Sequence, residues 1–152
     1  MTTTITTPVI RSATPSDLPA VERLLTASAL PLDGVREAFF TFVVAESGGD
    51  IVGVAGLEQS GEDALLRSVA VHPDVRSHGV GRALVTRVIS DAEARGLRAL
   101  WLLTTTAEHW FPGFGFHAAT RDEVPAGLRT TKEFTGACPA SATVMCRECA
   151  TR

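Results

Sequence analysis

A short loop with two glycines and three basic side chains is the part of the sequence best suited to bind a charged ligand. It consists of Arg76, Ser77, His78, Gly79, Val80, Gly81 and Arg82. It lies between a predicted strand ending at residue 71 and a predicted helix beginning near residue 81. The first turn of a helix exposes backbone N–H groups at the positive end of the helix dipole, and glycines leave them open to a phosphate. The loop therefore predicts a site for a pyrophosphate-bearing ligand.

Two common phosphate-binding motifs do not fit this loop. The sequence has no G-x-x-x-x-G-K-[ST] pattern, and no third glycine completes the dinucleotide-binding pattern. A dinucleotide-binding domain would also begin with its strand–helix–strand unit, whereas here that unit follows three predicted strands. The alternative for Gly79 and Gly81 is that they only shape a turn between strand and helix.

The elements that position the loop are predicted from residue spacing and turn signals. The spacing predicts a strand over residues 9–12, a capped helix over 16–28 and a short helix within 30–37. Strand formers separated by turns predict an antiparallel meander over 40–46, 51–59 and 64–71. A helix to about residue 95 and a strand over 97–103 then form a unit with parallel pairing. The remaining expectations are a short helix near 107–111, a strand after 116, an irregular segment over 122–139 and a last strand over 140–147.

These elements predict an α/β (α+β) fold with a mixed central sheet flanked by helices, antiparallel at first and parallel around the loop. We expect one domain over residues 1–152, with its core over about 9–147, because 152 residues can bury a sizeable core and no linker or repeat divides the chain. Apolar residues make up 45% and charged residues 20%, as is typical of globular proteins.

Charge and hydropathy exclude several classes of protein. The formal net charge of −3 argues against a nucleic-acid binder. Residues 76–98 hold five arginines against Asp91 and Glu93, so this stretch is locally positive and suits an anionic ligand. No apolar run is long enough for a membrane span, and the N-terminal residues lack the pattern of a signal peptide. We expect no membrane association and a cytoplasmic location.

The three cysteines predict free thiols. Cys146 and Cys149 have a spacing found in redox and metal sites, and Cys138 is a third thiol. A structural zinc site needs four ligands, however, and thiols of cytoplasmic proteins are ordinarily reduced. We therefore predict no metal site.

Residues 69–84 closely resemble the acetyl-CoA segment of the GCN5-related N-acetyltransferase (GNAT) superfamily. They read Val-Ala-Val-His-Pro-Asp-Val-Arg-Ser-His-Gly-Val-Gly-Arg-Ala-Leu. The predicted order of elements over about residues 9–120 is also similar, and residues 107–116 take the place of that superfamily's A-x-x-(F/L)-Y-x-x-x-G-F element. The resemblance implies an acetyl-CoA-dependent N-acetyltransferase that acts on an amine, with a homodimer as a common state.

A narrower resemblance concerns the acceptor. Residues 65–68, 102–108 and 131–142 are similar to the arsenic-resistance N-acetyltransferase branch. Relatives of that branch acetylate the amino group of glutamate-like toxins such as phosphinothricin and its arsenic analogue. This implies a small-molecule amine as the acceptor.

The resemblance also assigns residues to the cofactor. It implies that the strand before the loop diverges from the next parallel strand and that the pantetheine arm lies in the gap. A backbone N–H, assigned to Val71 as a catalytic group, would polarise the thioester carbonyl like an oxyanion hole. The residues expected to bind acetyl-CoA are Val69, Ala70, Val71, Arg76, Ser77, His78, Gly79, Val80, Gly81, Arg82, Thr104 and Phe111.

The chain departs from the superfamily at the general acid. Many members have a Tyr at the position of Phe111, which protonates the leaving thiolate, and this chain contains no Tyr. A thiol pKa of about 8.5 makes the thiolate a tolerable leaving group. Water, Thr106 or His109 could supply the proton instead. Thr104 stands where the superfamily often has Asn.

The acceptor side is predicted from polar residues near the strand ends. Glu58 is the first candidate for the base that deprotonates the amine, with Glu46 and His72 next; the alternative is that Glu58 is only an exposed strand-end carboxylate. Arg67, Ser68 and Thr106 are candidates for substrate binding, since an arginine can clamp a carboxylate bidentately. The alternative for Arg67 is a surface ion pair with Glu62 or Asp63.

Two other functions stay open at this point. A non-catalytic acetyl-CoA-binding module would explain the missing Tyr. A protein or peptide N-acetyltransferase would need an open groove. A small pocket enclosed by aromatic side chains would instead favour a small acceptor, and the candidates for such a wall are Phe39, Phe40, Trp110 and Phe111.

Overall fold

The computed structural model describes residues 7–76, 79–137 and 141–149. In these residues seven strands form one sheet with the order β1-β2-β3-β4-β5-β7-β6. The strands are β1 (Val9–Ser12), β2 (Val43–Ser47), β3 (Asp50–Ser60), β4 (Asp63–Val71), β5 (Ala99–Thr104), β6 (His117–Ala119) and β7 (Thr143–Glu148). The helices are α1 (Leu18–Ala27), α2 (Val35–Ala38), α3 (Val80–Ala94) and α4 (Ala126–Arg129). The pairing is antiparallel throughout except between β4 and β5, which are parallel, so the predicted mixed sheet is confirmed.

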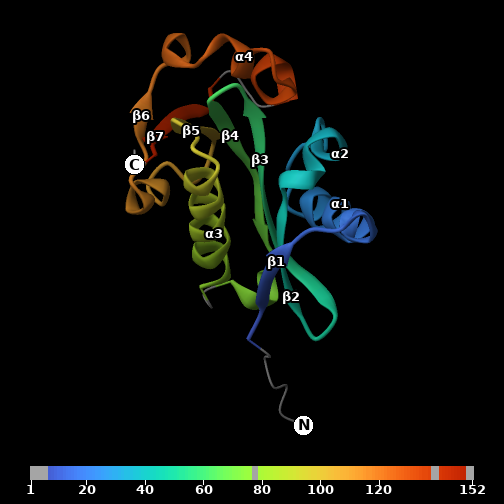
Figure 1. Ribbon diagram of the computed structural model, residues 1–152. Coiled ribbons are helices and arrows are strands. Elements are labelled where there is room, and N and C mark those ends of the chain that lie inside the picture. The colour runs from blue at the N-terminus through green and yellow to red at the C-terminus, as the bar shows by residue number, and fades with distance from the viewer. Residues whose placement is uncertain (1–6, 77–78, 138–140, 150–152) are drawn as a thin grey trace.

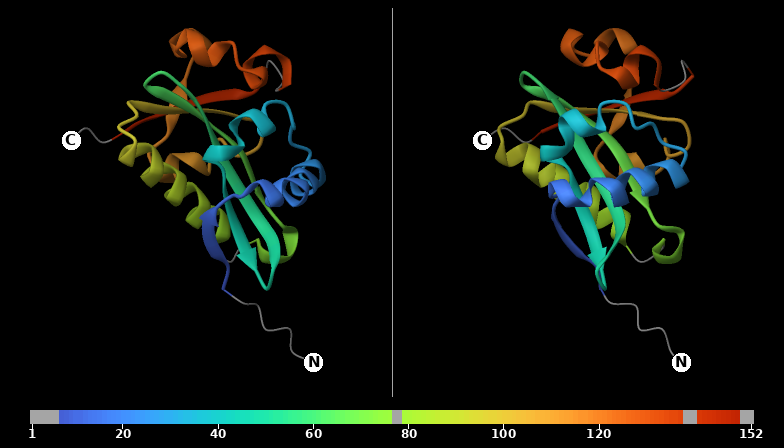
Figure 2. Two further views of the ribbon diagram at one scale, coloured as in Figure 1. Left: turned by 45° about the vertical axis from the view of Figure 1, so that its right-hand side comes forward. Right: turned by 90° about the vertical axis from the view of Figure 1, so that its right-hand side faces the viewer.

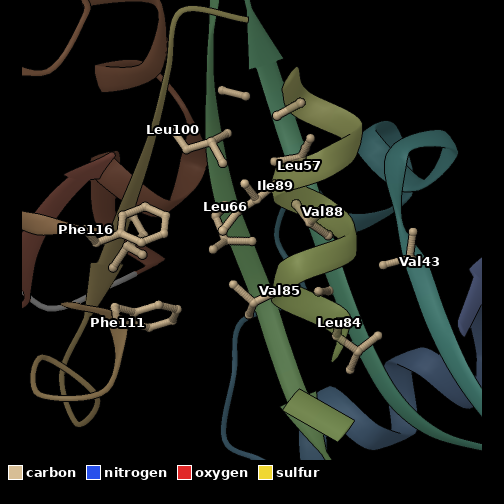
Figure 3. Close-up of a cluster of buried hydrophobic side chains, with 14 of the residues drawn as sticks. Val43, Leu57, Leu66, Leu84, Val85, Val88, Ile89, Leu100, Phe111 and Phe116 are labelled. Atoms are coloured by element: carbon tan, nitrogen blue, oxygen red, sulfur yellow. The ribbon is translucent and has the colours of Figure 1, made fainter. Parts of the chain in front are cut away.

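Helices cover both faces of the sheet (Figures 1 and 2). Helix α3 packs on one face, whereas α1 and α2 lie on the other. The core under α3 joins that helix to β3, β4 and β5, as Figure 3 shows for Leu84, Val88, Leu57, Leu66 and Leu100. A second core joins α1 to β2 and β3 through residues such as Val21, Leu25 and Val54. Each fully buried side chain of this size stabilises the fold by about 1.5–3 kcal/mol, which holds the sheet as a rigid support.

Three sequence expectations about local structure are wrong in detail. Strand β2 begins at Val43 and not at residue 40, because Phe39–Thr41 forms a 3₁₀ turn in which Thr41 Oγ1 donates to the carbonyls of Ala38 and Leu57. The short helix expected near residues 107–111 is a 3₁₀ helix over Phe111–Phe114. The segment expected to be irregular contains α4, a 3₁₀ turn and a π-helical turn over Glu133–Ala137. These turns are too short to leave a periodic pattern in the sequence.

The sheet opens between β4 and β5. The two strands pair only from Asp63 opposite Ala99 to Leu65 opposite Trp101, so residues 66–71 of β4 have no paired residue on β5. Beyond the last pair, β4 also carries a bulge, because its register with β3 shifts at Ser68, which has a φ of 60°. Bulges and left-handed non-glycine residues are frequent beside functional sites. The opening and the bulge therefore make this part of β4 a candidate for the functional site.

A glycine on β3 tests the packing behind the opening. A Cβ at Gly56 would lie 2.2 to 2.5 Å from ring atoms of Phe42, and Phe42 is 1% exposed, so its ring has no room to move. We expect Gly56→Ala to lower the free energy of unfolding by about 1–3 kcal/mol or more, as measured by urea denaturation. The control is Gly113→Ala, because no atom lies within 4 Å of the added Cβ, and its effect should stay within about 0.5 kcal/mol. Equal stability of Gly56→Ala and the wild type would contradict this packing.

Candidate functional site

A pocket of about 370 Å³ lies between the end of β4 and the start of α3. We call it the loop pocket. It is lined by Val69, Ala70, Val71, Val75, Arg76, Gly79, Val80, Gly81, Arg82 and Trp110. Eight of these ten residues are among those expected to bind acetyl-CoA. Ser77 and His78, from the same prediction, lie outside the described residues.

The N-terminus of α3 forms part of the wall of this pocket. Gly79 precedes the helix with a φ of 77°, a left-handed conformation that favours glycine. Among the described residues, the first bond of the helix runs from the Ala83 N–H to the Gly79 carbonyl, at 3.0 Å. No carbonyl of the described residues accepts from the N–H groups of Val80, Gly81 and Arg82, as is usual for the first turn of a helix, and such groups can donate to an anion. A Cβ on Gly81 would lie 3.5 Å from the Trp110 ring, and both residues line the loop pocket. The absence of a side chain at Gly81 therefore leaves room in this pocket.

Two arginines stand beside these donors. The Arg76 Nε donates to the Val71 carbonyl at 3.1 Å, which closes the turn after β4. The Arg82 guanidinium lies over the Phe114 ring, 5.5 Å from its centroid. Both residues are exposed, so the mouth of the loop pocket is positively charged as well as rich in backbone donors.

A second pocket, of about 240 Å³, adjoins the first. We call it the arginine pocket. Its wall includes the bulged part of β4, the end of β5, the segment before α2 and the turn Glu133–Ala137, which we call the C-terminal turn. The residues are Ala29, Leu30, Pro31, Leu66, Arg67, Ser68, Val69, Leu102, Leu103, Thr104, Thr105, Thr106, Ala107, Trp110, Phe111, Glu133 and Ala142. Val69 and Trp110 line both pockets, so the two pockets are neighbours that share part of their walls.

Arg67 is the charged centre of the arginine pocket. Its side chain is 0% exposed. Nη1 donates to Glu58 Oε1 at 2.8 Å, and Nε donates to Ser68 Oγ at 3.1 Å. Nη2 is buried and has no hydrogen-bond partner among the described residues. A buried guanidinium with an unused donor is costly unless a ligand oxygen accepts from it.

The alternative partners considered for Arg67 are wrong. Asp63 instead accepts from Arg98 Nη2 at 2.9 Å and from the Trp101 indole at 3.3 Å. Arg67 is not a surface charge, because the β4 position opposite Gly56 turns it into the protein. The sequence alone did not distinguish these cases, since an arginine in a strand can face either way.

Glu133 is the residue of this pocket that sequence reasoning missed. It is 5% exposed, and its Oε1 lies 3.6 Å from Arg67 Nε, longer than a hydrogen bond. Burial is the largest influence on the pKa of Glu133 and raises it; the positive charge of Arg67 opposes this and the negative charge of Glu58 adds to it, so that the pKa lies at about 7. Its only sequence signal is its place within residues 131–142, one of the segments that resemble the narrower branch.

The three carboxylate and histidine candidates for the base lie in different surroundings. Glu58 is held by Arg67 and does not line the arginine pocket. Glu46 accepts two hydrogen bonds from Arg11, at 2.7 and 3.1 Å, on the outer strands. The His72 ring accepts from the Asp74 N–H at 3.1 Å and caps a turn after β4. Of the three, only Glu58 contacts a residue that lines the arginine pocket.

Two of the four aromatic residues that were candidates for the wall of a small pocket line the arginine pocket. Trp110 and Phe111 line the arginine pocket, and Phe111 packs edge-on against Phe116 with ring centroids 5.7 Å apart (Figure 3). Phe39 instead packs in the core against Phe42. Phe40 is 78% exposed and lines neither pocket.

The threonines after β5 form one side of the arginine pocket. Thr104 Oγ1 accepts from the N–H of Ala107 at 3.0 Å and from that of Thr106 at 3.4 Å, which shapes the turn. Its O–H remains able to donate to a ligand. Thr106 is exposed and lines the same pocket.

Two of the three cysteines lie in the described part of the chain, and both are free thiols. Cys146 and Cys149 are buried, and burial raises the pKa of the Cys146 thiol to about 11 and that of Cys149 above its usual value. Reactive thiols have the opposite shift. In the part of the chain that the structure describes, no group of three or more His, Cys, Asp or Glu side chains could hold a metal ion. Cys138 lies outside that part.

A sheet that opens between two parallel strands, with a helix N-terminus at its mouth, is the arrangement that the loop's resemblance implied. The family model described as Acetyltransferase (GNAT) domain matches residues 38–118. The chain therefore belongs to the GNAT acetyltransferase family. Within the described residues, no helix has the length and apolar character needed to cross a membrane.

Curated relatives are named amino-acid acetyltransferases. The one from Serratia proteamaculans (strain 568) is 40% identical over 86 residues, which cover 55% of this chain and 20% of that protein. Eight such relatives are matched over only 15% to 29% of their own length. The similarity therefore concerns one part of those proteins.

Solved structures match nearly the whole chain. Rv2747 from Mycobacterium tuberculosis, in complex with CoA and NLQ, is 27% identical with a TM-score of 0.80 and covers 93% of this chain and 99% of that one. N-acetylglutamate synthase from Neisseria gonorrhoeae, complexed with coenzyme A and N-acetyl-glutamate, has a TM-score of 0.81, covering 94% of this chain and 35% of that one. At 24% identity the second match shows the fold.

Proposed function

We propose that this chain is an acetyl-CoA-dependent N-acetyltransferase whose acceptor is a small amine that carries a carboxylate. The observation that carries the proposal is the meeting of the two pockets at Val69 and Trp110, beside the unpaired part of β4. One pocket offers donors for phosphates, and the other offers a buried guanidinium. An acyl donor and a carboxylate-bearing acceptor would thus come together at the bulge.

The residues of the loop pocket fit acetyl-CoA. The N–H groups at the start of α3, with Arg76 and Arg82, suit the pyrophosphate. The unpaired edge of β4 from Val69 to Val71 suits an extended pantetheine arm, because its backbone groups lack partners on β5. When bound, acetyl-CoA supplies an acetyl thioester for attack by the amine, with release of coenzyme A. Thr104 and Phe111, further in, would lie near the acyl end.

Arg67 supports an acceptor of the amino-acid class. Its Nη2 lacks a hydrogen-bond partner among the described residues, and an acceptor carboxylate would satisfy it. Ser68 holds Arg67 through Nε, and Thr106 offers a hydroxyl across the pocket. Relatives named amino-acid acetyltransferase agree with this class. Within it, a glutamate-like toxin of the phosphinothricin or arsenical type is the finer proposal, which rests on the resemblance of residues 65–68, 102–108 and 131–142.

Phe111 leaves the departing thiolate without an aromatic hydroxyl. Its ring is 6% exposed and packs against Trp110 and Phe116. A thiolate with a pKa of about 8.5 can leave near neutral pH without a dedicated acid. We therefore propose that the missing Tyr does not abolish turnover.

The test is release of the coenzyme A thiol, followed with a thiol reagent, over a panel of amines. The panel holds glutamate, other amino acids, phosphinothricin, polyamines, aminoglycosides and short peptides. We expect measurable rates for amino acids with a free carboxylate, and lower rates for their carboxyl amides. Binding of acetyl-CoA without turnover of any amine would overturn the enzyme assignment, and preference for peptides or polyamines would overturn the acceptor class.

A further inference from the structure

We infer that Glu133 is the general base of this site and takes the proton from the acceptor's ammonium group. The inference rests on the proposed function. It assigns a role to a residue of the C-terminal turn that lies far from the loop and the meander in the sequence.

The first support is position. Glu133 begins the π-helical turn Glu133–Ala137 and lines the arginine pocket together with Arg67 and Ser68. Its Oε1 lies 3.6 Å from Arg67 Nε. Arg67 Nη2 has no hydrogen-bond partner among the described residues. A carboxylate-bearing amine bound to it would thus enter a pocket whose wall already holds the carboxylate of Glu133. Glu133 is 5% exposed, so few water molecules can reach its carboxylate and take the place of the acceptor's ammonium group.

The second support is charge. Among the described residues, the charged groups that face Glu133 are Arg67 on β4 and Glu58 on β3. Arg67 donates a 2.8 Å hydrogen bond to Glu58. The negative charge of Glu58 therefore offsets much of the positive charge of Arg67 that would otherwise stabilise an ionised Glu133. Burial then dominates and raises the pKa of Glu133 to about 7. A base is most effective when its pKa lies near the working pH.

The acceptor loses two protons during the transfer, one before and one after the C–N bond forms. The acceptor enters as an ammonium ion, and Glu133 takes one proton and becomes neutral. The freed lone pair forms the C–N bond to the acetyl carbon as the C–S bond breaks. The nitrogen's second proton leaves as the amide forms and converts the departing thiolate to the thiol. Glu133 returns its proton to solvent, so one proton is released per turnover. Nothing is oxidised or reduced.

Glu58 is less suited to this role. It does not line the arginine pocket, and its Oε1 is engaged by Arg67. Protonation of Glu58 would also weaken the pair that holds Arg67 in place. Glu58 is therefore assigned as a positioning residue, which fixes the guanidinium that binds the acceptor.

Two matched variants separate these roles. We expect Glu133→Gln to lower kcat by about 100-fold or more, since general-base catalysis contributes 10²–10⁴-fold, while the Kd for acetyl-CoA measured by calorimetry stays unchanged. Glu58→Gln removes the same charge from the other partner of Arg67. It should raise the acceptor KM more than it lowers kcat.

The pH profile is the readout that a structural role would not move. In the wild type, kcat/KM for the acceptor should rise through about pH 7 as Glu133 loses its proton, and an acceptor amine with a pKa above about 9 keeps its own ionisation apart. This rise near pH 7, the limb of the profile, should vanish in Glu133→Gln and persist in Glu58→Gln. Glu133→Asp, which keeps a carboxylate, should have a higher rate than Glu133→Gln and should retain the limb of the pH profile.

Each outcome decides between the two proposals. If the wild type turns over no amine, the proposed function fails. If the wild type turns over and Glu133→Gln keeps both its kcat and the limb near 7, the base assignment fails while the function stands. If the limb vanishes only in Glu58→Gln, Glu58 is the base. Should Glu133→Gln not fold by circular dichroism, the wild-type profile and Glu133→Asp decide, because absence of the limb in both overturns the inference.

Discussion

Arg67→Met is expected to lower kcat/KM for a carboxylate-bearing acceptor by about 100-fold or more, with the Kd for acetyl-CoA unchanged. Loss of a buried charged donor from a hydrogen-bonded pair costs about 2–5 kcal/mol of binding, and each 1.4 kcal/mol is tenfold. Met fills a similar volume without the charge, so the pocket keeps its shape. The effect should appear mainly in the acceptor KM, because Arg67 holds the acceptor and does not move its proton.

The structural cost of this change should be smaller than for most buried ion pairs. Breaking such a pair ordinarily costs about 3–5 kcal/mol because a buried charge is left unpaired. Here Glu133 can take a proton near neutral pH, and the Glu58 side chain is 24% exposed and can reach solvent. Removal of Arg67 also removes the attraction that lowers the pKa of Glu133, so the pH limb should move upward from about 7.

Controls for Arg67→Met come from the same sheet. Arg98→Met breaks a 2.9 Å pair with Asp63, but the Arg98 side chain is 64% exposed and does not line the arginine pocket. It should leave the acceptor KM within about twofold, because neither Arg98 nor Asp63 lines the arginine pocket. Arg67→Lys should recover only part of the activity, since an ammonium cannot present the guanidinium's fork. An unchanged acceptor KM in Arg67→Met would remove Arg67 from the acceptor site.

The sequence was most informative where the signals are local. The strand before residue 72, the two glycines and the helix after them follow one another directly, so their arrangement could be predicted without tertiary contacts. β4 and β5 were likewise predictable, because apolar runs bounded by turns predict buried strands. The start of β2 at Val43 was not predictable, since the turn before it is held by a hydrogen bond from Thr41 to the carbonyl of Leu57 on the neighbouring strand β3.

The arginine pocket shows the limit of this reasoning. Arg67 and Glu133 belong to elements that are distant in the chain, and only the fold brings them together. The burial that shifts the pKa of Glu133 comes from that packing and leaves no mark on the residues around it. Glu133 thus reaches the site from a polar segment that shows no periodicity in the sequence. Glu58 was the first candidate for the base because it lies near the end of a strand that the sequence does predict.

Gly79→Glu is expected to raise the KM for acetyl-CoA by about 10- to 100-fold, because a like charge placed against an anion costs several kcal/mol. Gly79 stands at the N-terminus of α3 with a φ of 77°, and open space surrounds its missing Cβ. A glutamate there would bring a carboxylate to the N–H groups proposed for the pyrophosphate and compete for them. The acceptor KM should change little, since Gly79 does not line the arginine pocket.

Gly96→Glu separates this electrostatic effect from backbone strain. Gly96 follows the other end of the same helix, with a φ of 73° and equally open space around its missing Cβ. The two substitutions therefore impose the same left-handed strain, of about 1 kcal/mol or more, and add the same charge. Thermal denaturation should show a somewhat larger loss of stability for Gly96→Glu, because a negative charge is unfavourable at the C-terminal end of the helix dipole and favourable at the N-terminal end. If Gly96→Glu raised the KM for acetyl-CoA as much as Gly79→Glu, the effect would come from the helix as a whole, and the loop would lose its assignment as the phosphate site.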